Sequence, residues 1–186
     1  MCDNIHIAWS NIETVANPLH FKKRPDYAKV NKQTNLECML AIDIAHTHNS
    51  RVNFISIQII QDMGFHGAKF PLPFGPAQGQ MGMRKNIELV RKWREAVGED
   101  YPLMIDCYMS LTVPYTIELA RRCEPYNVKW IEETLPPDEY EGYARIKEKV
   151  ASTLLTTGEH EYTRWGFRTL LEKKCCDVLQ PDITCK

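Results

Sequence analysis

The chain has 186 residues, of which 44% are hydrophobic and 25% are charged, a composition typical of a globular protein long enough to bury a core. Its 23 lysines and arginines nearly balance its 24 acidic residues, so the net charge of −1 gives no electrostatic reason to expect a nucleic acid or an anionic membrane as a partner. No apolar run approaches the roughly 18–20 residues of a membrane-spanning helix, and the first residues lack the pattern of an export signal.

Residues 1–52 are irregular and show no clear periodicity. They contain a basic cluster, "FKKR", and the pair His46 and His48, which could bind a metal but is more simply explained as part of a polar segment. A regular rhythm begins near residue 53, so we expect a boundary between an unmatched N-terminal segment, 1–52, and a domain at 53–186. Within that domain, residues 53–65 are expected to form the helix before the strand at 67–72, the second strand of the fold.

Short apolar stretches alternate with amphipathic ones from there to the end of the chain. The apolar stretches predict strands at 67–72, 102–108, 128–133, 153–159 and 177–182. The amphipathic stretches predict helices at 83–97, 113–124, 138–150 and 163–174. We expect Gly98 to end the first of these helices, Pro114 to lie in the first turn of the second, and Asp138 and Thr163 to cap the third and fourth. Three glycines predict a flexible loop at 73–83.

The alternation predicts an α/β fold with a parallel sheet, because each connection is long enough for a right-handed crossover. The near-continuous apolar strands are typical of such sheets. Two architectures fit, an open doubly wound sheet and part of a (β/α)8 barrel. No G-x-G-x-x-G follows any strand, which weakens the dinucleotide-binding version of the first.

Four of the predicted strands end on acidic residues. Asp106, Glu132, Glu159 and Asp182 are spaced by about one βα unit each, so we expect them at the C-terminal ends of successive parallel strands. That edge of an α/β sheet or barrel carries the active site. The sequence therefore predicts a functional site there.

Three carboxylates converging at one edge would repel each other, and a divalent cation would resolve the conflict. Asp106, Glu132 and Glu159 supply only oxygen ligands, which suits Mg²⁺ and makes zinc less suitable. A single acid in such a place is more simply a helix cap or a loop charge, but three in phase favour a metal site.

The seven cysteines include no C-x-x-C motif, and their number is odd. Without an export signal, this pattern predicts reduced thiols in a cytoplasmic protein. Most of them are expected to be small buried side chains.

Several motifs carry a resemblance to a known family. The stretches "IDCY", "WIEE", "TTGEHEYTRWGF" and "LQPDIT" resemble the barrel domain of the enolase superfamily, mandelate racemase subgroup. Taken with "AKFPLPFGP" and "KWIEETLPPDEY", they resemble the L-rhamnonate dehydratase family more narrowly. The resemblance covers about residues 60–186 and favours an incomplete barrel over a doubly wound sheet.

The resemblance implies a Mg²⁺-dependent hydro-lyase that removes the proton α to the carboxylate of a small sugar acid and eliminates water to give a 2-keto-3-deoxy acid. It implies that Asp106, Glu132 and Glu159 bind the metal and that Asp182 orients a histidine base on the next strand. Glu133 and His160 would face the substrate or support the metal ligands.

The sequence departs from that family in three respects. A Lys-x-Lys pair often ends the second barrel strand of the family, whereas Lys69-Phe70-Pro71 keeps one lysine, which could supply positive charge near the substrate. No histidine follows His160, and residues 1–52 do not resemble the family's capping domain. Three hypotheses therefore stay open: an L-rhamnonate-type dehydratase, another aldonate dehydratase of the subgroup, and a truncated non-catalytic remnant that keeps a metal site or serves as an interaction module. An opened barrel would expose strand edges, so a homo-oligomer is possible.

Overall fold

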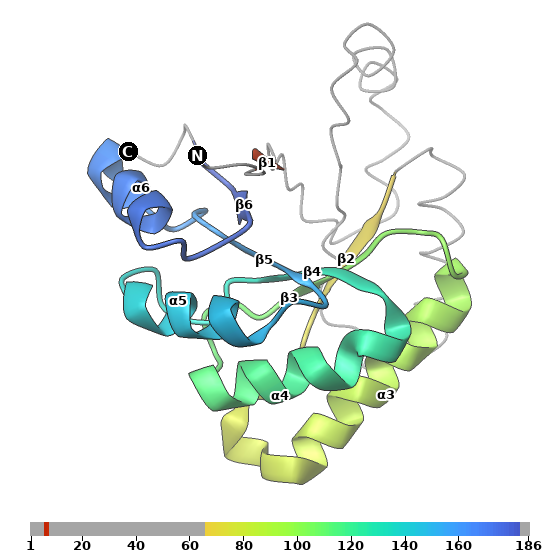
Figure 1. The fold of residues 1–186 in the computed structure, drawn as a ribbon. Helices are drawn as coiled ribbons and strands as arrows, with labels where there is room; N and C mark the ends of the chain where they lie inside the picture. The colour runs from red at the N-terminus through yellow and green to blue at the C-terminus, as the bar shows by residue number, and fades with distance from the viewer. Residues whose placement is uncertain (1–5, 8–65, 183–186) are drawn as a thin grey trace, which may run out of the picture.

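The structure, a computed structural model, describes residues 6–7 and 66–182 (Figure 1). The strands are β1 (His6–Ile7), β2 (Ala68–Pro71), β3 (Leu103–Asp106), β4 (Val128–Glu132), β5 (Leu154–Thr157) and β6 (Val178–Leu179). The α-helices are α3 (Gly79–Val97), α4 (Val113–Cys123), α5 (Tyr140–Lys149) and α6 (Thr163–Glu172). Two 3₁₀ turns, η2 (Pro76–Gln78) and η3 (Glu124–Tyr126), precede α3 and follow α4. All five strands and four helices predicted from residue 67 onward are confirmed.

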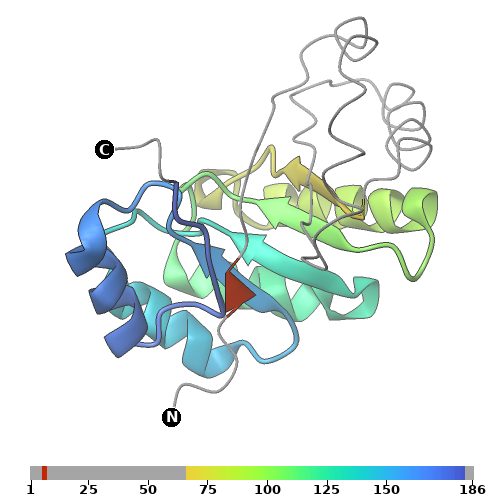
Figure 2. The same ribbon diagram turned by 90° about the horizontal axis from the view of Figure 1, so that it is seen from above.

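The six strands form one parallel sheet in the order β1-β6-β5-β4-β3-β2. From β2 to β6 the spatial order follows the chain order, without the reversal that defines a doubly wound sheet. The helices lie along one face of this sheet (Figures 1 and 2). Sequential parallel strands with helices on one face are the arrangement of a (β/α) barrel, so the barrel alternative is the correct one.

β1 is a strand that the sequence analysis did not predict. His6 and Ile7 pair in parallel with Val178 and Leu179, next to β6 at the edge of the sheet. A strand of two residues carries too little periodicity to be recognised in a sequence. The other predictions for the N-terminal segment, namely the boundary at 52/53, the basic cluster, the histidine pair and a helix at 53–65, lie outside the described residues.

The two faces of the strands have different surroundings, as the alternation of side chains in a strand requires. Phe70 points toward the helices and stacks on Trp93 of α3, with ring centroids 5.1 Å apart and planes 8° from parallel. Ile105, Ile131 and Leu155 are fully buried in the same core cluster. Lys69, adjacent to Phe70 in the strand, therefore belongs to the opposite face.

The loop predicted at 73–83 is wrong in its second half, because η2 begins at Pro76 and α3 at Gly79. The glycines that suggested flexibility serve packing instead. A Cβ on Gly82 would lie 2.6 Å from Cβ of Gln78 and 3.0 Å from Cβ of Phe74, so only glycine lets this turn approach the chain. The amide of Gly75 also donates to Oε1 of Gln78 at 2.8 Å, which fixes the entry to the helix.

Helix ends were predicted with mixed success. Gly98 ends α3 with a positive φ, and Pro114 lies in the first turn of α4, both as expected. Asp138 is not the cap of α5, because the amide of Glu139 donates to Pro136 O in a turn that delays the helix to Tyr140. Thr163 is the first residue of α6, which follows Tyr162, although Thr163 Oγ1 accepts a hydrogen bond from the amide of Trp165.

Two further findings concern the helices and the cysteines of residues 6–7 and 66–182. None of the helices there is long and apolar enough to cross a membrane. The four described cysteines, Cys107, Cys123, Cys175 and Cys176, are free and buried. Burial raises the pKa of the Cys176 thiol to about 12, which makes it an unreactive core side chain.

Arg94 closes the end of the sheet opposite the acids. Its guanidinium donates to five backbone carbonyls, two of them just after α3 at Gly98 and Glu99 and three at Tyr101, Tyr126 and Asn127. The fixed fork of an arginine can satisfy these carbonyls together, whereas a lysine has only three donors on one nitrogen. Arg94 thus joins the loop before β3 to the loop before β4.

Tyr143 performs the corresponding role near the other end of the strands. The Tyr143 side chain is 1% exposed, and its hydroxyl donates to Leu135 O at 2.6 Å and accepts from the amide of Leu135 at 3.2 Å. Thr157 Oγ1 of β5 donates to the same hydroxyl at 3.3 Å. The hydroxyl therefore fixes the loop that follows Glu132 and Glu133 against α5 and β5.

We expect Arg94→Lys to destabilise the fold by about 2–3 kcal/mol, because several buried carbonyls lose a charged donor. Urea unfolding followed by circular dichroism would measure the loss. Arg91→Lys on the exposed side of α3 is the matched control and should change stability by less than about 0.5 kcal/mol. Equal effects of the two substitutions would show that the carbonyl contacts of Arg94 do not support the fold.

We expect Tyr143→Phe to cost about 1–3 kcal/mol, because it leaves the amide and carbonyl of Leu135 without their buried partner. The midpoint of urea unfolding would report this change. Tyr162→Phe, which removes a hydroxyl from a side chain that is half exposed, serves as the control and should be neutral. A neutral Tyr143→Phe would contradict the role assigned to this hydroxyl.

Candidate functional site

The predicted acids lie at the C-terminal edge of the sheet, two of them in register. Asp106 is the last residue of β3, Glu132 is the last residue of β4, and the two are paired across the ladder. Glu159 and Asp182 were predicted to end their strands, but β5 ends at Thr157 and β6 ends at Leu179. These two acids therefore lie in the loops just beyond the sheet.

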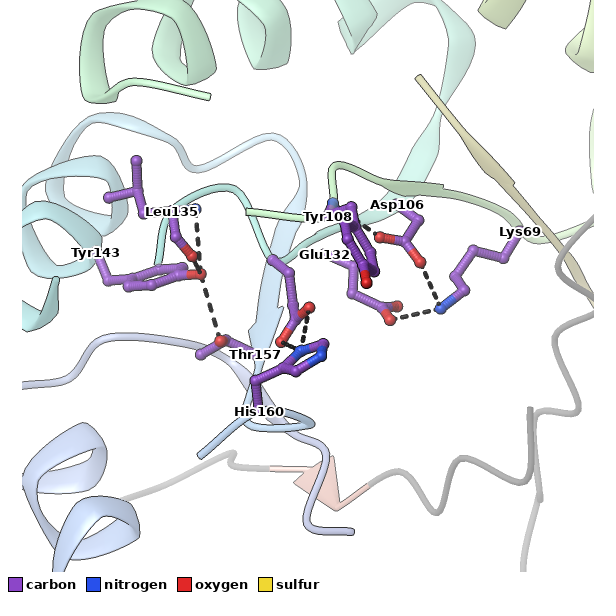
Figure 3. A network of polar contacts seen from close by, with 9 residues as sticks. Lys69, Asp106, Tyr108, Glu132, Leu135, Tyr143, Thr157 and His160 are labelled. Atoms are coloured by element: carbon purple, nitrogen blue, oxygen red, sulfur yellow. Dashed lines mark hydrogen bonds and ion pairs between the residues drawn. The ribbon is translucent and has the colours of Figure 1, made fainter. Parts of the chain in front are cut away.

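The side chain of Lys69 joins the two paired acids. Its Nζ lies 2.5 Å from Oε1 of Glu132 and 3.0 Å from Oδ2 of Asp106 (Figure 3). The side chains of Lys69 and Glu132 are 1% and 0% exposed, and that of Asp106 is 12% exposed. A buried ammonium group thus lies between two carboxylates from neighbouring strands.

The buried Glu132 carboxylate has two further partners that the sequence analysis missed. Trp130 Nε1 donates to Oε2 of Glu132 at 3.1 Å, and the side-chain amide of Gln180 also hydrogen-bonds the carboxylate. The spacing of Trp130 and Glu132 in "KWIEE" contains a signal for the first contact, because residues two apart in a strand share a face. No comparable signal marks Gln180, which directly follows β6 and reaches Glu132 across the intervening strand β5.

Burial and charge act in opposite directions on these groups. Burial by itself would lower the pKa of Lys69, but the charges of Glu132 and Asp106 outweigh it and raise that pKa above its usual value. Burial raises the pKa of Glu132, and the nearby Asp106 adds to the rise, while the charge of Lys69 opposes it. Lys69 is therefore held as a cation and is unsuited to act as a general base in this state.

Glu159 has a different environment from the paired acids. Burial raises the pKa of its carboxyl group, the charge of Lys69 lowers it, and Glu133 and Asp106 raise it further. No hydrogen bond or ion pair joins Glu159 to another residue in the part of the chain that the structure describes. Among the described residues, no group of three His, Cys, Asp or Glu side chains is close enough together to enclose a metal ion.

The donor set nevertheless fits a hard divalent cation. A cationic group already lies between Asp106 and Glu132, and Glu159 follows the neighbouring strand β5 at the same edge. All three donors are carboxylates, the ligand type that Mg²⁺ prefers.

His160 and Glu133 form a second pair beside the first. His160 Nδ1 lies 2.8 Å from both carboxylate oxygens of Glu133, which is 2% exposed (Figure 3). Burial would lower the pKa of His160, but the hydrogen bond and charge of Glu133 raise it. Because Nδ1 is occupied, Nε2 is the ring nitrogen left to meet a ligand.

Tyr108 completes this part of the edge and was not singled out from the sequence. Its ring meets the His160 ring edge-on, with centroids 6.0 Å apart and planes at 87°, while its backbone amide donates to Oδ1 of Asp106 at 3.0 Å. The side chain is 70% exposed, which is unusual for so large a group. Tyr108 thus connects Asp106 with the pair of Glu133 and His160, and it leaves aromatic surface open to a ligand.

The backbone at this edge adopts left-handed conformations that side chains normally avoid. Tyr108, Met109 and Glu133 have φ values of 46°, 58° and 43°, and Gly158 has a φ of 123°. Glu133 and Gly158 follow directly after β4 and β5, and Tyr108 and Met109 lie two and three residues beyond the end of β3. A non-glycine residue in this region costs on the order of 1–2 kcal/mol, and such strain is concentrated at functional sites.

Comparisons with known proteins agree with this geometry. A model of the family "Enolase C-terminal domain-like" matches residues 56–185. The chain is 54% identical to the rhamnonate dehydratase from Gibberella zeae complexed with Mg, with a TM-score of 0.65, over 67% of this chain and 31% of that one. It is 30% identical to the 3,6-anhydro-D-galactonate cycloisomerase from Zobellia galactanivorans, with a TM-score of 0.64, over 72% of this chain and 36% of that one.

A third similar structure also contains the metal. The chain is 25% identical to a racemase from Streptomyces coelicolor A3(2) with bound magnesium, with a TM-score of 0.69, over 77% of this chain and 41% of the racemase. The matched part thus spans between about a third and two fifths of the length of these relatives. Sequence, sheet order and strand-end acids lead to one conclusion, that the chain belongs to the enolase C-terminal domain-like family and so to the mandelate racemase/enolase superfamily.

Proposed function

We propose that the chain contributes the metal-binding edge of a Mg²⁺-dependent sugar-acid dehydratase with an L-rhamnonate-like substrate. The observation that carries the proposal is the pair of buried carboxylates, Asp106 and Glu132, held in register around a cation. The 54% identity to a rhamnonate dehydratase complexed with Mg supports both the metal and the substrate class. In the reaction a base would take the α-proton of the acid, and an acid would protonate the β-hydroxyl group as it leaves as water.

Asp106, Glu132 and Glu159 are the residues that would hold Mg²⁺. When bound, the ion would supply positive charge to the carboxylate of the sugar acid, where negative charge develops as the α-proton leaves. The chain itself supplies the desolvated setting. Glu132 is fully buried and Trp130 is 4% exposed, so water competes weakly for charges at this edge.

His160 and Glu133 are proposed to bind the substrate. The contact with Glu133 fixes the imidazole ring, so Nε2 can exchange a hydrogen bond with a hydroxyl group of the sugar acid. The exposed ring of Tyr108, at right angles to the imidazole, would support the same hydroxyl-rich ligand.

Lys69 and Asp182 are proposed to act in catalysis without serving as the base. Lys69 is held protonated by its two acidic neighbours and would contribute positive charge. Asp182 lies beyond β6 at the same edge, half-buried, where it would orient a proton-transferring group.

Two narrower alternatives differ from this proposal in substrate or in activity. Similarity to a 3,6-anhydro-D-galactonate cycloisomerase at 30% identity favours a different sugar acid as the second candidate substrate. A domain that binds Mg²⁺ without turnover is the other alternative. The near-neutral net charge and the free buried thiols support a cytoplasmic protein without a nucleic acid or membrane partner. Unpaired strand edges favour self-association into a homo-oligomer.

Calorimetric titration with Mg²⁺ is the experiment that tests the metal site. We expect saturable binding to the parent chain and at least about tenfold weaker binding to Glu159→Gln, a loss of about 1.4 kcal/mol, because a carboxylate ligand is removed without disturbing Lys69. Glu139→Gln, which neutralises an exposed acid before α5, is the control and should bind like the parent. Absence of binding to the parent chain would refute the metal site.

Turnover separates the dehydratase from the alternatives. With saturating Mg²⁺, we expect the chain to form a 2-keto-3-deoxy acid from L-rhamnonate faster than from other aldonates, and Glu132→Gln to abolish the product. Coupled detection of the 2-keto acid would provide the rate. A faster reaction with another aldonate would change the substrate, whereas Mg²⁺ binding without any product would favour the non-catalytic alternative.

A further inference from the structure

Lys69 carries its charge in the buried interior, where an unpaired charge strongly destabilises the folded protein. Its side chain is 1% exposed, and its ammonium group contacts carboxylates from two other strands, β3 and β4. A buried ion is tolerated only when it is paired and hydrogen-bonded. Lys69 is therefore buried here because the neighbouring carboxylates require a positive charge close to them.

That need follows from the ladder that pairs Asp106 with Glu132. Two carboxylates on adjacent buried strands repel each other strongly unless a cation lies between them. Lys69 reaches them from β2, whose Pro71 is paired with Asp106 in the same sheet. The ammonium group is thus supplied by the strand next to the acids.

The oxygens of the two carboxylates are divided between Lys69 and other donors. Lys69 takes Oε1 of Glu132 and Oδ2 of Asp106. The remaining two oxygens, Oε2 of Glu132 and Oδ1 of Asp106, accept from the Trp130 indole and the Tyr108 backbone amide. Each carboxylate thus turns one oxygen toward Lys69, and a cation that bridged the two acids at these oxygens would compete with the ammonium group.

We propose that Lys69 is an internal counter-ion, which neutralises Asp106 and Glu132 in the metal-free protein and competes with a divalent cation for their oxygens. The inference rests on the proposed Mg²⁺ site for its second half. Lys69 thereby allows the carboxylates to be buried before any metal binds, and it weakens the affinity of the edge for that metal.

Charge counting gives the expected direction. Asp106, Glu132 and Glu159 together with Lys69 carry two net negative charges, which one divalent cation balances. Without Lys69 the edge carries three negative charges, so it attracts the cation more strongly. When the cation is absent, the three carboxylates also repel one another more strongly. Removal of the ammonium group should therefore have opposite effects on metal affinity and on metal-free stability.

The test is thermal unfolding of the full chain and of Lys69→Met, each with EDTA and with Mg²⁺, accompanied by Mg²⁺ calorimetry. In EDTA we expect Lys69→Met to lower Tm by at least about 5 °C. With Mg²⁺ we expect a larger rise in Tm than in the parent, and at least about tenfold tighter binding. Lys129→Met removes an exposed lysine from β4 and should change neither quantity.

A second variant separates lost charge from lost packing. In Lys69→Met/Asp106→Asn one of the uncompensated charges is gone, so the Tm in EDTA should return toward the parent value. An unchanged Tm for Lys69→Met in EDTA would overturn the proposal, and so would a loss that Asp106→Asn does not restore. If Lys69→Met does not fold in EDTA, the double variant alone decides between these outcomes.

The same experiment distinguishes this inference from the proposed metal site. Restoration by Asp106→Asn without any effect of Mg²⁺ on the parent or the variant would support the counter-ion and refute the magnesium proposal. If Mg²⁺ raised the Tm of both chains equally and bound both with equal affinity, the metal site would be supported but competition by Lys69 would be overturned.

Discussion

The burial of two like charges on adjacent strands is the constraint on which the rest of this structure depends. The parallel register between β3 and β4 places Asp106 beside Glu132, and nothing in that ladder can separate them. The chain meets the constraint by concentrating donors at one point: an ammonium group, an indole N–H and a side-chain amide all reach Glu132. Removing one member of such a network destabilises the fold by far more than the intact network stabilises it. These residues are therefore needed for the acids to be buried, but they add little net stability.

The scaffold around the network is divided by function along the strand direction. At one end Arg94 connects loops through backbone carbonyls only, which is a structural role. At the other end the chain accepts left-handed backbone at Tyr108, Met109 and Glu133 and exposes an aromatic ring. This division agrees with the rule for α/β barrels that the N-terminal side of the strands supports stability and the C-terminal side supports chemistry.

Much of the fold could be predicted from the sequence, because the strands and helices beyond residue 66 have strong apolar periods. Asp106 and Glu132 could be placed at strand ends for the same reason. The prediction was less exact for Glu159, since the glycine before it turns the chain out of the strand. It failed at 73–83, where glycine means close packing rather than flexibility, and only the positions of Phe74 and Gln78 in space reveal the difference. The contacts of Gln180 and β1 depend on pairing between distant segments, for which one sequence has no local signal.

The pairing of β1 with β6 has a consequence for how the chain is made. His6 and Ile7 pair with Val178 and Leu179, so β1 cannot pair until β6 has been synthesised. At a synthesis rate of about 5–20 residues per second, that wait is on the order of 10–30 s, far longer than a helix or a hairpin needs to form. The strands β2 to β5 pair with sequence neighbours and can assemble during that interval. β1 is therefore the strand that stays unpaired longest, and until β6 is made it remains open to any other strand that a crowded cell presents.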